Sequence, residues 1–372
     1  MNICPTQCIA MKPDKCGFFF PVVDNTMCVE CGKCEKVCPA GTELNNPGAM
    51  QVYAAASKKD GIRKESSSGG IFYLLAKNII DNGGVVYGAA FDEDFAVCHE
   101  FAETEIQLHG LTGSKYAQSR LDNTFSEVKK QLDAGRKVMF SGVPCQVQGL
   151  LNYLGKFYDN LLTVDLACHG VPSPKALERY IEYQEGIYGS GIKSFSFRNK
   201  NTGWRNYSVR IEFENGKIYS KPFGEDSYML SFLLNYNIRE CCGECRFRSL
   251  ARNSDITLAD FWDADKLMPD MDDDKGLSTV TVHSVKGAEM LSAIQENLNI
   301  KELPQNMIDK LQDTISMQTA ISAKRNVFFE ALSGKGFEEA YRKASHVSIV
   351  ERIIRKDYSE GLYCNFPMDM LS

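Results

Sequence analysis

Apolar and polar positions follow two rhythms along this chain, and each rhythm predicts a different kind of element. Apolar residues at helical spacing predict helices, and short apolar runs bounded by turn residues predict buried strands. From residue 123 onward the two kinds alternate, with predicted helices at 124–134, 147–154 and 175–185 and predicted strands at 137–141 and 161–167. This alternation is typical of parallel strands in an α/β domain.

The flanking segments carry further predicted elements. A short apolar strand is predicted within 17–24, and a strand at 53–58, a helix at 71–80 and a strand at 85–91 precede the alternating region. After it, two antiparallel strands are predicted at 207–213 and 217–220, and further strands at 254–262 and 278–284. Helices are predicted at 287–297, 320–332 and 337–355, and the last two are charged. A turn-rich linker at 41–48 separates the first residues from the rest.

One stretch departs from both rhythms and carries cysteine at short, regular spacing. It contains Cys28, Cys31, Cys34 and Cys38, and Pro39 follows the last of them. This is the ligand run of bacterial ferredoxins, in which the last cysteine of each run ligates the other cluster. A zinc site is the weaker interpretation, because zinc usually takes two well-separated pairs.

Cys4 and Pro5 look like the end of an earlier run of the same kind. With Cys4, the first three cysteines of the later run complete one 4Fe-4S cluster, and Cys38 belongs to a second cluster whose other ligands are not in the sequence. We therefore expect Met1 to be an internal methionine, with the true start about ten residues upstream. Cys8 and Cys16 fit no run and are interpreted as ordinary thiols.

A second group of cysteines belongs to the alternating region. Cys145 and Cys168 each follow a predicted strand, at the strand ends where α/β sheets carry their sites. Cys242 and Cys245 form a Cys-x2-Cys pair, and we interpret the neighbouring Cys241 as a bystander. Four thiolates suffice for one 4Fe-4S cluster or a structural zinc, and a redox dithiol is the third option.

Two loops are candidates for ligand binding. The segment 66–70, Ser-Ser-Ser-Gly-Gly, leads into a predicted helix, where free N–H groups favour an anion; a plain helix cap is the alternative. The segment 110–119 combines glycine, hydroxyls, a cation and an aromatic ring, and a surface turn is its alternative. Arg198 and Lys200 could hold a phosphate or carboxylate, but a solvated strand end is the role expected for them. The segment 270–275 is expected to be a solvated acidic loop, and a cation site is its less favoured alternative.

Composition bounds the class of protein. The chain has 372 residues, of which 44% are hydrophobic and 24% charged, as in ordinary soluble globular proteins. A net charge of -6 argues against nucleic acid as a partner, and no stretch is long and apolar enough to span a membrane. The 14 cysteines are clustered like metal ligands, which predicts the reducing cytoplasm of an anaerobe.

Taken together and in this order, several short motifs resemble one family, the beta subunits of coenzyme F-420 hydrogenase/dehydrogenase, from Cys4 to about Leu291. The motifs are Ser66-Ser-Ser-Gly-Gly-Ile-Phe72, Gly113-Ser-Lys-Tyr-x-Gln-Ser119, Phe140-Ser-Gly-Val-Pro-Cys-Gln146, Cys168-His-Gly-Val-Pro-Ser-Pro174, Cys242-x2-Cys245 and Ser254-Asp-Ile-Thr-Leu-x-Asp-Phe-Trp262. The resemblance implies FAD and 4Fe-4S clusters as cofactors. It implies flavin contacts at Ser68, Gly69, Gly70, Gly113, Ser114, Lys115 and Tyr116, and a cluster near the flavin held by Cys145, Cys168, Cys242 and Cys245.

These observations predict an α+β or α/β protein in four parts. They are a ferredoxin-type 4Fe-4S domain at 1–48, the two parts of a mixed α/β flavin-binding domain at 49–135 and 136–300, and a helical tail at 301–372. Members of the family pass electrons between clusters and a two-electron partner, so the resemblance implies an oxidoreductase that works with a partner protein or ferredoxin and a soluble coenzyme such as F-420. The alternatives are an electron carrier with a zinc-stapled α/β domain, without flavin, and a thiol–disulfide reductase using Cys242 and Cys245.

Overall fold

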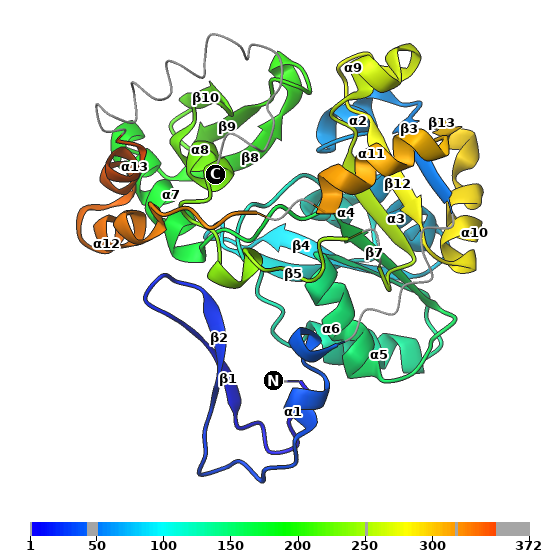
Figure 1. Ribbon diagram of the computed structural model, residues 1–372, viewed down its shortest axis with the longest axis horizontal. Coiled ribbons are helices and arrows are strands. Elements are labelled where there is room, and N and C mark those ends of the chain that lie inside the picture. Colours follow the sequence, from blue (N-terminus) through cyan, green and yellow to red (C-terminus); the bar gives the residue numbers. More distant parts are fainter. Residues whose placement is uncertain (1, 43–50, 250–251, 317–318, 347–372) are drawn as a thin grey trace.

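The computed structural model describes residues 2–42, 51–249, 252–316 and 319–346. Its largest element is a mixed sheet of eight strands in the order β13-β3-β12-β11-β7-β6-β4-β5 (Figure 1). Four neighbouring strands, β11, β7, β6 and β4, are parallel, and the others run antiparallel to the strands beside them. In sheet order the strands are Leu298–Glu302, Gln51–Ser57, Ser278–Val282, Ile256–Asp260, Leu161–Leu166, Val138–Gly142, Val85–Phe91 and Val97–Ala102.

Helices cover both faces of this sheet because strand side chains alternate between the two faces. On one face, α3 and α10 pack in a core that includes Met139; on the other, α5 and α6 pack around Phe140, the next residue of β6. The predicted α/β alternation is therefore confirmed. The helices around the sheet are α2 (Asp60–Glu65), α3 (Ile71–Asp81), α4 (Glu105–Leu111), α5 (Thr124–Asp133), α6 (Pro144–Leu154), α9 (Ala264–Leu267), α10 (Val285–Ala293) and α11 (Gln305–Ser316).

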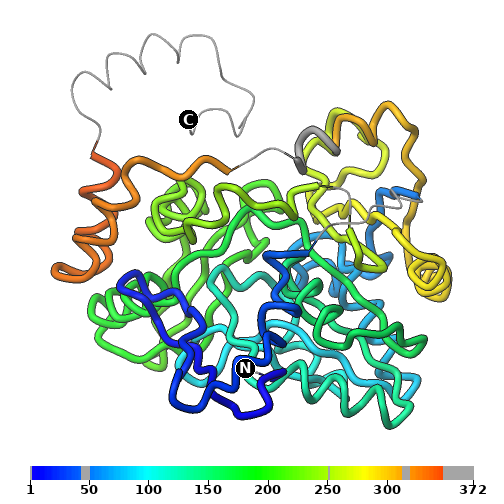
Figure 2. Tube along the Cα trace, turned by 60° about the horizontal axis from the view of Figure 1, so that its bottom comes forward, coloured from blue at the N-terminus to red at the C-terminus, as the bar shows by residue number. Residues whose placement is uncertain are grey.

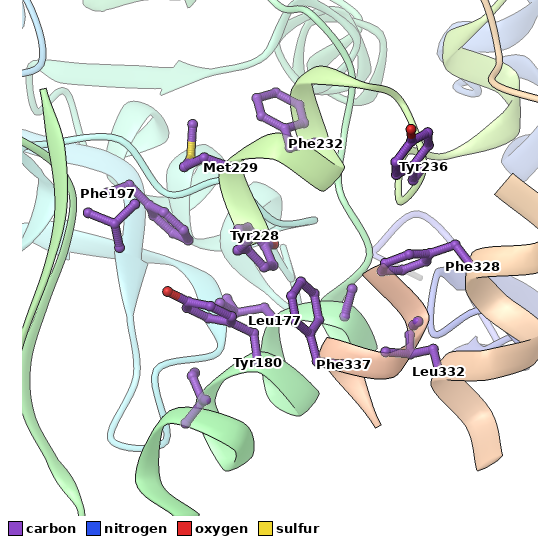
Figure 3. Close-up of a cluster of buried hydrophobic side chains, with 14 of the residues drawn as sticks. Leu177, Tyr180, Phe197, Tyr228, Met229, Phe232, Tyr236, Phe328, Leu332 and Phe337 are labelled. Atoms are coloured by element: carbon purple, nitrogen blue, oxygen red, sulfur yellow. The ribbon is translucent and has the colours of Figure 1, made fainter. Parts of the chain in front are cut away.

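A smaller antiparallel sheet, β10-β9-β8, packs with four helices around an aromatic core (Figure 3). In this core Tyr180 lies with its ring centroid 5.2 Å from those of both Tyr228 and Phe337. Asp226 begins α8 and accepts hydrogen bonds from Tyr180 and Tyr219, so its buried carboxylate is fully bonded. The elements are β8 (Ile192–Asn199), β9 (Ser208–Phe213), β10 (Ile218–Pro222), α7 (Pro174–Tyr188), α8 (Ser227–Leu233), α12 (Arg325–Lys335) and α13 (Phe337–Ser345).

The N-terminal segment forms a hairpin and two short helical turns. Strands β1 (Ile9–Pro13) and β2 (Phe19–Val23) pair antiparallel, and α1 (Lys33–Lys36) and η1 (Pro39–Gly41) follow. The hairpin projects from the body in Figure 1, and the turned view of Figure 2 shows the same blue segment in front of the green and cyan part of the chain. The loop between its strands inserts Cys16 and Phe18 into the aromatic core.

The predicted domain boundary near residue 48 lies outside the described residues. The large sheet takes strands from both sides of the predicted boundary at residue 135. The domain limits therefore stay predictions. Helices α11, α12 and α13 follow the last strand, and the predicted helix end at 355 lies outside the described residues. Across the described ranges, no helix combines the length and apolar character needed to cross a membrane.

Candidate redox site

Two of the predicted ligand cysteines lie at adjacent strand ends. Strands β6 and β7 pair in parallel up to Gly142 and Asp165, so the segments that follow them leave the sheet side by side. Cys145 lies in the first turn of α6, and Cys168 follows β7. The position predicted from the sequence, just past two parallel strands, is therefore the one observed.

A third segment brings the Cys-x2-Cys pair to the same place. Ile238 pairs with Pro172 in an isolated bridge, and the N–H of Arg239 donates to the Val171 carbonyl over 2.8 Å. This pairing carries the turn η3 (Glu240–Cys242) over the loop after β7, where the Cβ of Cys242 lies 3.6 Å from the position that a Cβ on Gly170 would take. The residues predicted at 145, 168, 242 and 245 thus converge from three elements.

The electrostatics of this group suit thiolates held around a cation. Burial, and after it the nearby thiols of Cys168 and Cys245, raise the pKa of Cys145 to about 12. Burial also raises the pKa of Cys168, whereas Arg248 and Arg252 oppose that rise. Four thiolates that are largely shielded from water repel one another unless a positive group lies between them. An iron–sulfur cluster or a zinc ion supplies that charge, so the donor set fits either.

Cys241 lies at the edge of this group. A hydrogen bond with the Cys242 thiol lowers the pKa of Cys241 to about 6 and raises that of Cys242, and the Cys241 thiol also raises the pKa of Cys145. The interpretation of Cys241 as a bystander to the ligand set stays a prediction. In the described ranges no three His, Cys, Asp or Glu side chains already stand around a single metal position.

The ferredoxin-type run docks beside this cysteine group. The amide of Asn152, near the end of α6, donates to the Val37 carbonyl over 3.3 Å and to the Thr42 hydroxyl over 2.7 Å. Arg246, next to Cys245, donates to the Thr42 carbonyl over 2.9 Å. The segment around Cys38 is thus fixed against the helix and the loop that present Cys145 and Cys245.

Gln118 and Arg239 are among the side chains that hold the hairpin to the body. Gln118 forms two hydrogen bonds with the backbone of Phe19, of 2.8 and 3.3 Å, and Arg239 donates to the Phe19 carbonyl over 3.1 Å. The Arg239 guanidinium also lies 4.0 Å from the ring centroid of Phe20. Gln118 stands inside a motif that marks the family, but nothing in the sequence identifies its partner 99 residues away.

The tip of the hairpin depends on Gly17. This residue has φ of +86°, and a Cβ on it would lie 2.3 Å from the Cβ of Lys175. We expect Gly17→Ala to loosen the tip, because alanine costs about 1 kcal/mol or more in the left-handed region and also collides with Lys175. Faster hydrogen exchange at residues 14–20 measures this. Gly135→Ala is the control: its φ is +78° but its Cβ would meet open space, so an equal effect at the tip would contradict the prediction.

The two predicted flavin loops lie against each other. The hydroxyls of Ser67 and Ser114 are 2.7 Å apart, which joins the loop before α3 to the loop after α4. Ser68 donates to the Leu277 carbonyl, and the amine of Lys200 donates to the Ser68 carbonyl, so the first loop is fixed from its other side. Residues far apart in the sequence therefore form one rigid loop pair.

The three predicted glycines differ in function. A Cβ on Gly69 would lie 2.5 Å from the Ala55 carbonyl oxygen, and one on Gly70 would lie 2.9 Å from Ile62. These two glycines serve packing, and Gly70, with φ of +86°, is also the residue that begins α3, as the cap alternative expects. Gly113 has φ of +79° and faces open space, so a ligand has room to approach it.

Lys115 brings a half-buried amine to the loop pair. Its amine donates to the carbonyls of Gly110 and Thr112, which uses two of its three N–H groups. Burial lowers the pKa of Lys115 to about 7, and the neighbouring Cys98 opposes that shift. A half-buried amine with one N–H group left over is suited to bind an anionic group such as a phosphate.

A single aromatic ring connects this loop pair to the cysteine group. The Phe232 ring centroid lies 4.9 Å from that of Tyr116 and 5.1 Å from that of His169, which follows Cys168 in the chain. The N–H of Gln118 donates to the Pro172 carbonyl over 3.0 Å and ties the same two loops. The loop predicted to contact flavin and the loop that carries Cys168 are therefore neighbours.

A cleft of about 390 Å³ opens beside the loop pair. Ser66 and Thr112, one from each loop, line it together with residues of α2, α3 and α4. On its wall His109 lies 3.2 Å from a carboxylate oxygen of Glu65. The volume lies within the range of small-molecule sites, roughly 300–1,000 Å³.

The expectation that Arg198 lies at a solvated strand end is wrong. Arg198 is buried rather than solvated: burial opposes its charge, but the carboxylate of Asp260, 2.6 Å away, raises the pKa of the guanidinium. Lys200 uses all three N–H groups on carbonyls. The acidic loop 270–275 lies at the surface as expected, and its exposed Asp273 also pairs with the buried Arg63.

The N-terminal cysteines divide into two sets. Cys4 and Cys28 are half-buried, and the thiol of Cys8 lies 3.3 Å from that of Cys4. Cys31, Cys34 and Cys38 are exposed, and Cys16 lies elsewhere, in the aromatic core, where its carbonyl accepts a bond from Ser173. The ligand assignment at Cys4, Cys28, Cys31, Cys34 and Cys38 stays a prediction.

Comparison with known proteins agrees with the resemblance found in the sequence. Residues 135–306 match the family described as the C terminus of the coenzyme F420 hydrogenase/dehydrogenase beta subunit, and residues 21–42 match the 4Fe-4S binding domain. A coenzyme F420-dependent sulfite reductase of Methanocaldococcus jannaschii is 24% identical over 329 residues, which are 76% of this chain and 48% of that protein. The chain thus spans about half the length of this relative.

Among solved structures, a chain of the F420-reducing [NiFe] hydrogenase complex from Methanosarcina barkeri is similar. The TM-score is 0.48 at 20% identity, and the similarity covers 74% of this chain and 92% of that one. The family matches confirm the predicted resemblance and the 4Fe-4S region, and they place the chain among proteins related to iron–sulfur oxidoreductases.

Proposed function

We propose that this chain is an iron–sulfur flavoprotein oxidoreductase, because residues 135–306 match the coenzyme F420 hydrogenase/dehydrogenase family. It connects a one-electron partner protein, such as a ferredoxin, with a soluble two-electron coenzyme, for which F420 is the candidate that the relatives' names suggest. When bound, 4Fe-4S clusters exchange single electrons and FAD takes up two. The rest of the proposal concerns what this chain's own residues do.

Ligand binding is divided between two sets of cysteines. The N-terminal run with Cys4 holds a cluster toward the partner, and the group at 145, 168, 242 and 245 holds a second cluster deeper in the chain. The bonds of Asn152 and Arg246 to the Cys38 segment keep the two sets adjacent. Gln118 and Arg239 fix the hairpin, so these two residues position the first set relative to the second.

The flavin contacts belong to the loop pair. Ser68, Gly69, Gly70, Gly113, Ser114, Lys115 and Tyr116 form or flank its surface, and Lys115 supplies the charge for the phosphates of FAD. The observation that carries this proposal is the position of Phe232, whose ring contacts both Tyr116 and His169. That ring keeps water out of the short space between the flavin loop and the Cys168 loop.

Electron delivery tests this arrangement. A one-electron donor should bleach the flavin absorption band of the anaerobic parental protein. In Cys168→Ala the flavin content should persist while the donor no longer reduces the flavin, because the group that joins donor and flavin is gone. Equal rates of flavin reduction in the two proteins would contradict the proposed order.

Replacement of Lys115 by methionine should weaken FAD binding by roughly ten- to hundredfold, the value of a hydrogen bond to a charged group. The parental affinity should depend on pH. Because the amine of the free protein has a pKa of about 7, and because an anion favours the protonated amine, binding is strongest below about pH 7 and weakens as pH rises. Titration of the flavin into apoprotein measures both effects.

Lys115→Arg is the matched variant, since it keeps a charge that does not titrate in this range. It should bind FAD with an affinity that changes little between pH 7 and 9. If Lys115→Met keeps both the parental affinity and its pH dependence, Lys115 is not a phosphate contact.

A further inference from the structure

Cys8 stands outside every ligand set assigned so far, yet it lies among the predicted ligands. Its sulfur is 3.3 Å from that of Cys4, and Asp24 accepts a backbone bond from Cys28 while donating one to Cys8. Only 6% of Cys8 is exposed, whereas Cys4 and Cys28 are half-buried. The thiols of Cys4 and Cys8 therefore form a pair beside the loop that carries Cys28, with Cys8 on the protected side.

The backbone holds Cys8 in this position. A turn closed by the bond from the Gln7 N–H to the Cys4 carbonyl reverses the chain, and Gln7 adopts φ of +54° in it. The Cys8 carbonyl accepts a 2.8 Å bond from the N–H of Asp24, whose own carbonyl accepts from Cys28. The loop that carries Cys28 is thus tied to Cys8 through a single residue.

Cys16 provides the contrast. It is as buried as Cys8, but it lies in the aromatic core, where its thiol is close to Arg325. Burial alone therefore does not bring a cysteine of this segment to Cys4. The neighbourhood of Cys8 results from the turn and from the start of β1.

We propose that Cys8 is an alternative thiolate ligand for the iron atom assigned to Cys4. Each iron of a 4Fe-4S cluster takes one cysteine from the protein, and two sulfurs 3.3 Å apart lie at the same corner, so one binds while the other is in reserve. The exchange is a simple substitution. Cys8 releases its thiol proton to solvent as it binds iron, Cys4 takes up a proton as it leaves, and no electron is transferred. The inference rests on the proposed function only in requiring a cluster at this place.

The test compares Cys4→Ala, Cys8→Ala and the double variant, each purified whole and without oxygen. Both single variants should keep the iron content of the parental protein, and the double variant should lose about four irons per chain. Loss of about four irons in Cys4→Ala alone, or parental iron in the double variant, would overturn the inference.

A labelling experiment guards against misfolding of the double variant. In Cys4→Ala, Cys8 should resist iodoacetamide until a chelator removes the iron, as shown by mass spectrometry, and the electron paramagnetic resonance of the reduced cluster should change because its ligand has changed. Labelling of Cys8 before chelation would overturn the inference. Cys16→Ala is the control and should keep its iron. A parental protein without iron would instead contradict the proposed function, so the two failures are distinguishable.

Discussion

Replacement of Cys145 by alanine should remove about four irons per chain and leave the N-terminal cluster in place. Cys145 lies in the first turn of α6, and its pKa responds to the thiols of Cys168, Cys245 and Cys241, so it belongs to one shared group. With one of four thiolates gone, the cluster near the flavin has an open corner and is lost during purification. Iron analysis and the absorption spectrum measure this.

Cys98→Ala is the matched control for this change. Cys98 is also buried, with its thiol against Ala90 and Glu100 on β4 and β5, away from the cysteine group. It should keep the full iron content. An equal loss of iron in both variants would mean that iron is lost through general destabilisation and not through the missing ligand.

Replacement of Asp260 by alanine should lower the free energy of unfolding by about 3–5 kcal/mol. The Arg198 guanidinium bonds to both Asp260 oxygens, at 2.6 and 3.2 Å, and has a side chain only 4% exposed. It also lies 4.6 Å from the Tyr207 ring centroid and 5.0 Å from that of Trp262. Without the carboxylate, a charge stays buried among rings with no counter-charge. Urea unfolding followed by tryptophan fluorescence measures the loss.

Two variants decide whether the unpaired charge is the cause. Glu182→Ala removes the partner of Arg179 in an exposed pair, and should cost under about 1 kcal/mol. The double change Arg198→Met with Asp260→Leu removes both charges and should recover most of the lost stability. If the double variant is as unstable as Asp260→Ala, then the packing of the two side chains, and not the unpaired charge, accounts for the lost stability.

The sequence predicted the parts of the site that depend on local order. Cys145 and Cys168 follow parallel strands, so their proximity follows from sheet geometry once the strands are recognised. Periodicity likewise predicted α3, β4, β6 and β7 within a few residues of their observed bounds. The motif order predicted a resemblance that the family match over residues 135–306 confirms.

What the sequence did not predict depends on contacts between distant segments. Arg198 looks like a solvated strand end until β11 places Asp260 beside it, and nothing in the sequence indicates that Arg63 reaches Asp273 from α2. Cys241 and Cys8 fit no spacing rule. The structure brings Cys241 to its group through the pairing of Ile238 with Pro172, and it brings Cys8 to Cys4 through a turn. A spacing rule describes one segment at a time, so it misses cysteines that the fold brings together from several segments.

The most direct test of the account is the content of iron, zinc and flavin in the whole chain, purified without oxygen. The account predicts about eight irons per chain, as two 4Fe-4S clusters require, together with one FAD. About four irons with one zinc and no flavin would contradict it, and would leave an electron carrier whose α/β domain is held by a structural zinc at Cys145, Cys168, Cys242 and Cys245.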